Sequence, residues 1–164
     1  KKVYLDILNT AREYVHIMTP YLILDYEMIM ALTYAAKRGI DVSIIMPHIP
    51  DKKYAFAVAK TYYNELLEAG VKIYEYTPGF VHAKEFLCDD KEAVVGTINL
   101  DYRSLYLHFE DGVYLYQCSA VADMLKDYQD MISVSEEVTE MYRQSSKSRL
   151  SIGQCLLRII APLL

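Results

Sequence analysis

A histidine and a lysine lie two residues apart in the middle of the chain, as His82 and Lys84. We expect them on one β-strand, where alternate side chains share a face, so that an imidazole nucleophile and a cation would meet the same ligand. Thr97 and Asn99 share parity after the next expected strand, and Gly96 permits a close backbone approach. An imidazole, an ammonium group and neutral donors suit reaction at phosphorus, where stabilising charge on the phosphoryl oxygens does most of the work.

Asp89 completes the spacing pattern but has the opposite parity to His82 and Lys84. We therefore expect Asp89 to brace the hairpin that follows it instead of contacting the ligand. An isolated His-x-Lys pair is more often ordinary surface than a site. The joint spacing of the six positions, from His82 to Asn99, is what favours catalysis.

The elements that must position these residues follow a helix, glycine, strand rhythm that is typical of parallel β-α-β construction. Asp25 and Asp51 are expected to cap two helices that end before Gly39 and Gly70. Further helices are expected over residues 3–11, 120–132 and 146–161, and strands over 14–18, 42–46, 71–75, 86–88, 93–95 and 112–116. Residues 86–95 should form a hairpin. The predicted fold is a single α/β domain over residues 1–164.

The composition limits the classes of function. The 164 residues are 53% hydrophobic, and the net charge of -5 disfavours a dedicated nucleic-acid binder. Three widely spaced cysteines and four scattered histidines favour neither a disulfide framework nor a metal site, and no cofactor is expected. No apolar run approaches the roughly 18 residues of a membrane span, so we expect a soluble chain. It begins without Met inside a helical pattern, which suggests a piece of a longer protein.

The six spaced positions resemble the HKD motif of the phospholipase D superfamily, His-x-Lys-x4-Asp-x6-Gly-[Ser/Thr]-x-Asn, and each of them matches. Residues 19–22, 47–52, 70–80 and 101–105 also resemble the C-terminal half of a bacterial cardiolipin synthase. The similarity spans nearly the whole chain. It implies a phospholipase-D-like mixed sheet flanked by helices on both faces, in a parent enzyme on the cytoplasmic face of the cell membrane.

The resemblance implies phosphatidyl transfer between two phosphatidylglycerol molecules through a phosphatidyl-histidine, without metal or ATP. In such enzymes one histidine attacks phosphorus and another serves as acid and base, and the C-terminal motif is usually assigned the acid/base part. Lys84 and Asn99 would hold phosphate oxygens with help from Thr97, and Glu110 would orient an active-site imidazole. Asp89 belongs to the catalytic set as a motif member.

Two further side chains are candidates for substrate binding. Arg103 follows the motif and would hold either a second phosphate or a neighbouring carboxylate. His108 has the parity of Glu110 and either faces the same cleft or is an ordinary packed or surface residue. His48, in a loop after an expected strand, is either a ligand-binding residue or structural.

The resemblance implies two HKD motifs, whereas the chain contains one. It is either a fragment that pairs with an N-terminal HKD half or a homodimer that brings two His82 residues together. The alternatives are accordingly a homodimeric phosphodiesterase or nuclease, or an inactive half that serves as a membrane-associating module. Residues 141–164 contain four basic residues and no acid, so residues 146–164 are expected to form an amphipathic helix that either packs on the body or docks on an anionic membrane surface.

Overall fold

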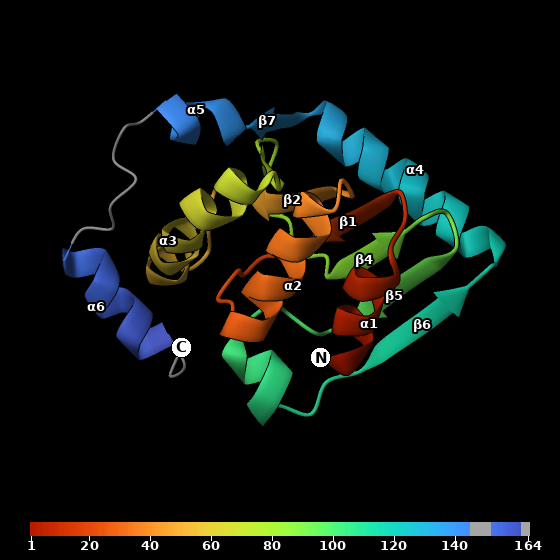
Figure 1. Ribbon diagram of the computed structural model, residues 1–164, viewed down its shortest axis with the longest axis horizontal. Coiled ribbons are helices and arrows are strands. Elements are labelled where there is room, and N and C mark those ends of the chain that lie inside the picture. Colours follow the sequence, from red (N-terminus) through yellow and green to blue (C-terminus); the bar gives the residue numbers. More distant parts are fainter. Residues whose placement is uncertain (145–151, 162–164) are drawn as a thin grey trace.

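The computed structural model describes residues 1–144 and 152–161. In this part of the chain, seven strands form one mixed sheet in the order β6-β5-β4-β1-β2-β3-β7 (Figure 1). The strands are β1 (Tyr14–Met18), β2 (Asp41–Pro47), β3 (Lys72–Tyr76), β4 (Glu85–Cys88), β5 (Glu92–Gly96), β6 (Gly112–Tyr116) and β7 (Ser135–Glu137). The helices are α1 (Lys2–Thr10), α2 (Tyr26–Lys37), α3 (Lys53–Ala69), the π-helix η1 (Arg103–Leu107), α4 (Ser119–Ser133), α5 (Thr139–Gln144) and α6 (Ile152–Ile160).

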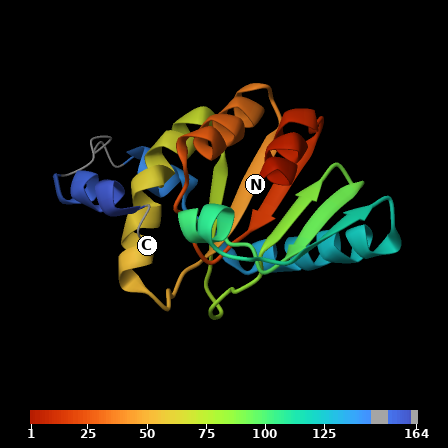
Figure 2. The same ribbon diagram turned by 90° about the horizontal axis from the view of Figure 1, so that it is seen from below.

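Helices cover both faces of the sheet, as predicted. Figure 2 shows α1, α2 and α3 on one face and α4 on the other. The larger apolar core lies under the first three helices, and a smaller one, which includes Leu87, Val121 and Tyr128, lies under α4. Burial of this apolar surface is the main source of stability and holds the strands at fixed positions.

The structure confirms the parallel β-α-β construction that the sequence predicted for the first half of the sheet. Strands β1, β2 and β3 are parallel, and α2 and α3 connect them. The Asp25 carboxylate accepts a hydrogen bond of 2.7 Å from the Met28 amide and so caps α2. Gly70 ends α3 with a φ of 101°, a left-handed conformation that glycine adopts without strain.

Two expectations about elements were wrong, and a third is described only in part. The N-cap of α3 is Lys52, because the Asp51 carboxylate accepts a hydrogen bond from the Tyr21 hydroxyl instead. His82 and Lys84 precede β4 and lie in irregular backbone, since β4 begins at Glu85. The helix expected over 146–161 is described only from Ile152 to Ile160, and residues 146–151 lie outside the described part. The elements α5, β7 and η1 were not predicted.

Within residues 1–144 and 152–161, no helix is long and apolar enough to cross a membrane.

Candidate functional site

The motif residues other than Asp89 lie at one edge of the sheet because of the strand directions. Strand β1 ends at Met18, which pairs with Glu85, the first residue of the antiparallel strand β4. Strand β5 ends at this edge with Gly96, which pairs with Gly112 of β6. Since β2 and β3 run parallel to β1, their carboxyl ends lie there too. The loops that carry residues 77–84 and 97–111 therefore converge at the carboxyl ends of the parallel strands, where ligands commonly bind in α/β sheets.

The Lys84 side chain is buried at this edge and remains close to negative charge. It is 8% exposed, and its ammonium group donates a hydrogen bond of 2.6 Å to the backbone oxygen of His82. Burial lowers the pKa of Lys84, while the charges of Glu110, Asp101 and Asp51 act in the opposite direction. A desolvated ammonium group attracts an anion more strongly than one in water does.

The His82 ring is exposed and lies 5.6 Å from the ring of Phe80, measured between ring centroids. The expectation that His82 and Lys84 share a strand face was wrong, because both residues precede β4. The two residues are instead joined by the hydrogen bond from the Lys84 side chain to the His82 backbone. The imidazole is consequently accessible to a ligand or a partner from outside.

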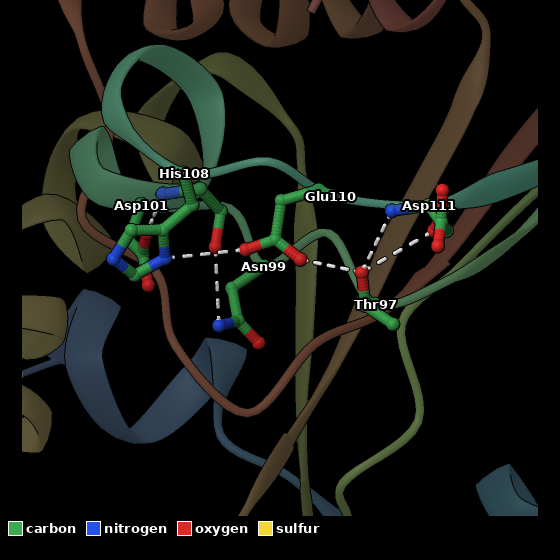
Figure 3. Close-up of polar contacts among 7 residues, drawn as sticks. Thr97, Asn99, Asp101, His108, Glu110 and Asp111 are labelled. Carbon is green, nitrogen blue, oxygen red and sulfur yellow. Dashed lines mark hydrogen bonds and ion pairs between the residues drawn. The ribbon is translucent and has the colours of Figure 1, made fainter.

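Glu110 joins two other site residues (Figure 3). One carboxylate oxygen accepts a hydrogen bond from the Thr97 hydroxyl, and the other lies 3.3 Å from Nδ1 of His108. Burial opposes ionisation of Glu110, but hydrogen bonds with Thr97, Ser104 and His108 together hold its pKa below the ordinary value. The imidazole that Glu110 contacts thus belongs to His108, and no contact between Glu110 and His82 is found among the described residues.

Asn99 is held by η1, the π-helix that follows the motif. Its amide nitrogen donates to the Ser104 hydroxyl at 3.3 Å, and the Ser104 backbone amide donates to Asp101 at 2.7 Å. The side-chain oxygen of Asn99 is buried and has no hydrogen-bond partner among the described residues. An unpaired buried acceptor is costly in a folded protein, so its presence beside the motif calls for an explanation, of which a role in ligand binding is one.

A cavity of about 260 Å³ opens beside Asn99. Arg103 and His108, both candidates from the sequence, line its wall together with Lys52 and Asp101. The cavity is contiguous with the motif through Asn99. The structure therefore brings Thr97, Asn99, Arg103, His108 and Glu110 to one region.

Gly96 and Asp89 have structural roles at opposite ends of the hairpin. A Cβ atom at Gly96 would lie 2.1 Å from the backbone oxygen of Asp111, so only glycine fits, as the close approach predicted. Asp89 follows the far end of β4, where its carboxylate accepts backbone hydrogen bonds from Arg12, Glu13 and Tyr14 at 2.8 to 2.9 Å. Asp89 is therefore not brought together with the other motif residues, and it ties the hairpin to the loop between α1 and β1.

The remaining histidines have structural partners. His48 contacts the buried carboxylate of Glu75 at 3.0 Å, and His16 stacks between Tyr14 and Tyr128. Burial lowers the pKa of His16 to about 4. In the described part of the chain, no three His, Cys, Asp or Glu side chains are grouped so that they could hold a metal ion.

Sequence reasoning missed three residues of this region, namely Lys52, Asp101 and Ser104. Ser104 bridges Asn99 and Glu110, and Asp101 fixes the backbone of η1. These residues lie in the segments 47–52 and 101–105, both of which resemble the family, and that resemblance was the available signal. The individual contacts of Asp101 and Ser104 depend on the π-helix η1, and local sequence patterns do not indicate a π-helix.

Comparison with known families gives a match over most of the chain. Residues 4–132 match the family model described as "Cardiolipin synthase, PLD-like domain". An uncharacterised protein of Streptococcus mutans is 57% identical over the whole chain, which covers 36% of that relative. Cardiolipin synthase 2 of Bacillus cereus is 38% identical over the whole chain, which covers 32% of that protein. The chain thus spans about a third of the length of the curated relatives it matches.

Two solved structures share the fold. The phospholipase D family member Nuc of Salmonella typhimurium has a TM-score of 0.73 at 19% identity, over 83% of this chain and 88% of Nuc. The phosphatidylserine synthase of Haemophilus influenzae has a TM-score of 0.70 at 19% identity, over 99% of this chain and 42% of the synthase. At these identities the likeness concerns the fold, and it agrees with the predicted phospholipase-D-like sheet.

Proposed function

Because the chain belongs to the family of cardiolipin synthase, PLD-like domains, we propose that it supplies one half of a phosphatidyltransferase site, with His82 as its imidazole. Transfer of phosphatidyl groups between phospholipids is supported at the level of the family. The finer assignment is that two phosphatidylglycerol molecules give cardiolipin and glycerol. The observation that carries the proposed half-site is that His82 is exposed while its backbone oxygen accepts a hydrogen bond from the buried ammonium group of Lys84.

The proposed reaction has two displacements at phosphorus. In the first, an imidazole nitrogen bonds to phosphorus, the bond to the headgroup glycerol breaks, and a second imidazole gives the leaving oxygen a proton. In the second, the hydroxyl group of another phosphatidylglycerol loses a proton to that second imidazole and attacks phosphorus. The phosphorus–nitrogen bond breaks, and cardiolipin leaves. Lys84, Asn99 and Thr97 would stabilise the negative phosphoryl oxygens, and the reaction requires no metal or nucleotide.

The second imidazole of this scheme is proposed to come from another HKD motif. The chain spans about a third of its curated relatives, so an N-terminal half of the same enzyme is our preferred source. Exposed apolar side chains lie in the loops of the site edge, among them Ile49, Phe80, Leu107 and Phe109. Such a group of apolar residues suits cover by another half or by lipid.

The test is histidine replacement in the complete enzyme. His82→Asn should abolish cardiolipin formation from phosphatidylglycerol vesicles, because either role of the imidazole is then lost. His48→Asn is the matched control, since it removes an imidazole from the same edge that is paired with Glu75 and lies outside the motif. Unchanged cardiolipin formation in His82→Asn would refute the assignment.

A homodimeric phosphodiesterase is the second candidate, and the fold shared with Nuc favours it. Nuc, a solved chain with this fold, is covered over 88% of its length. In this candidate two copies would bring two His82 side chains together. Size-exclusion chromatography of the 164-residue chain, followed by assays on phosphatidylglycerol and on DNA, separates it from the first candidate: a dimer active alone supports it, and a monomer without turnover supports the fragment.

A further inference from the structure

The cavity beside Asn99 contains two cations at positions that the phosphoryl-transfer scheme does not use. Lys52 lies at the start of α3, and Arg103 is the first residue of η1. Asn99 forms part of the same wall, so a ligand in the cavity would touch the residue proposed to hold the reacting phosphate. At about 260 Å³ the cavity is smaller than pockets for drug-sized molecules and suits a headgroup.

Neither cation is neutralised by a direct ion pair within the described residues. The Lys52 ammonium group lies 5.3 Å from the centre of the Tyr21 ring, and both side chains are exposed. Among the nearby carboxylates, Asp51 accepts from the Tyr21 hydroxyl at 2.6 Å and does not line the cavity, whereas Asp101 lines it and accepts from the Ser104 amide. The cavity wall therefore carries the two cations Lys52 and Arg103 against the single carboxylate of Asp101, and the remaining positive charge attracts an anion.

The proposed reaction needs a place for a second phosphate. The donor phosphate reacts beside Lys84 and Asn99, while the acceptor phosphatidylglycerol carries a phosphate of its own. In cardiolipin the two phosphates are joined by a three-carbon glycerol bridge, so their binding positions must be adjacent. The cavity is adjacent to the first position through Asn99.

We propose that Lys52 and Arg103 bind the phosphate of the acceptor phospholipid and thereby place its free hydroxyl group at the reacting phosphorus. This inference rests on the proposed phosphatidyl transfer and adds its acceptor specificity. Arginine binds phosphate oxygens in pairs and lysine supplies a compact charge. An acceptor held this way has an advantage over water and over free glycerol, because orientation replaces random collision.

The experiment compares two acceptors in the complete enzyme with phosphatidylglycerol as the donor. Phosphatidylglycerol as acceptor gives cardiolipin, and radiolabelled glycerol as acceptor gives labelled phosphatidylglycerol. Free glycerol offers the same hydroxyl groups without a phosphate. The measured quantity is the ratio of the two products at fixed acceptor concentrations.

In the double variant Lys52→Gln with Arg103→Gln, we expect this ratio to fall at least about tenfold, since loss of one charge-assisted hydrogen bond already corresponds to roughly that factor. The matched control is Arg12→Gln with Lys126→Gln, which removes the same two charges from exposed positions outside the cavity. The control should keep the wild-type ratio.

An unchanged ratio in the double variant, whether both products fall or neither does, overturns the acceptor site. Should the double variant melt at a lower temperature than the wild type, the single variants Lys52→Gln and Arg103→Gln decide by the same ratio. A wild-type enzyme that forms no cardiolipin would instead refute the proposed function.

Discussion

Two carboxylates at the ends of β4 show how residues of one charge acquire opposite roles. Glu85 opens the strand, and one of its carboxylate oxygens is buried without a hydrogen-bond partner among the described residues. Burial, followed by the charge of Asp127, raises its pKa to about 7. Asp89 follows the strand, where burial opposes ionisation but the amides of residues 12–14 hold its pKa below 3.8. The first carboxylate opposes folding at alkaline pH, and the second favours it.

Conservative amides at the two positions should change stability in opposite directions. Glu85 takes up a proton on folding between its ordinary pKa of 4.5 and about 7, so the free energy of unfolding falls as pH rises through that window. Glu85→Gln should therefore raise the free energy of unfolding by about 1 to 2 kcal/mol at pH 8, after allowance for solvent screening, and change little at pH 4.5. Urea unfolding of the 164-residue chain at both pH values measures this.

Asp89→Asn is the opposite-signed control. The stabilising effect of the wild-type Asp89 carboxylate is present above its ordinary pKa of 3.8. This effect is lost as pH falls below 3.8 and through the lower pKa of the folded state. We expect a loss of about 1 kcal/mol at pH 8. Asparagine suits the comparison because it tolerates the φ of 52° at this position. A Glu85→Gln variant that is less stable than wild type at pH 8 would contradict the account of the buried carboxyl.

At the scale of elements, the sequence predicted helices and strands whose signal lies within the element itself. It did not predict features that depend on a residue distant in the sequence. Strands β1 and β6 and the Asp25 cap of α2 follow from apolar patterning and from a side chain that reaches its own helix. Asp51 had the same capping chemistry, but the Tyr21 hydroxyl, distant in sequence, engages it. Strand β7 is a three-residue edge strand with two acids, which has no apolar alternation to detect.

The site shows the same division. The motif spacing located Lys84, Thr97 and Asn99 at one edge, because a hairpin fixes where its flanks lie. The resemblance implies that Glu110 orients an active-site imidazole; in the structure Glu110 contacts His108, and the role of Glu110 stays a prediction. A π-helix forms through tertiary contacts more than through propensity, so the bridge that η1 makes through Ser104 was not predictable.

The η1 element yields a prediction about positioning. Ser104→Ala removes the hydroxyl that accepts from Asn99 and bonds to Glu110, so two site residues lose a shared support. In the complete enzyme we expect kcat/KM for cardiolipin formation to fall about tenfold, which corresponds to roughly 1.4 kcal/mol. Ser133→Ala, which removes an exposed hydroxyl from α4, is the matched control. Equal kcat/KM values in the two variants would show that Ser104 does not position the site.

At the scale of the molecule, α6 combines packing on the body with an exposed apolar side. Arg158 lies over the Tyr62 ring at 4.4 Å, donates to the backbone oxygen of Thr61 at 2.9 Å and contacts Glu65. Ala161 is buried, while Leu156 and Ile159 are 59% and 73% exposed. The sequence left two alternatives for this helix, packing on the body and docking on a membrane. The two are compatible, because they would use different sides of α6. Lys147 and the other tail residues over 145–151 and 162–164 lie outside the described part.

This arrangement predicts how the chain meets a membrane. We propose that Leu156 and Ile159 insert at the surface of anionic vesicles while Arg158 keeps α6 attached to α3. Leu156→Ser with Ile159→Ser should weaken co-sedimentation of the 164-residue chain with phosphatidylglycerol-containing vesicles at least about tenfold, because each exposed side chain would contribute roughly 1.5 to 3 kcal/mol on burial. Val3→Ser with Val134→Ser removes comparable exposed apolar side chains elsewhere and should leave vesicle binding intact. Equal binding of the two double variants would contradict the proposal. Any membrane contact would then lie on another surface, and α6 would serve only to pack on the body.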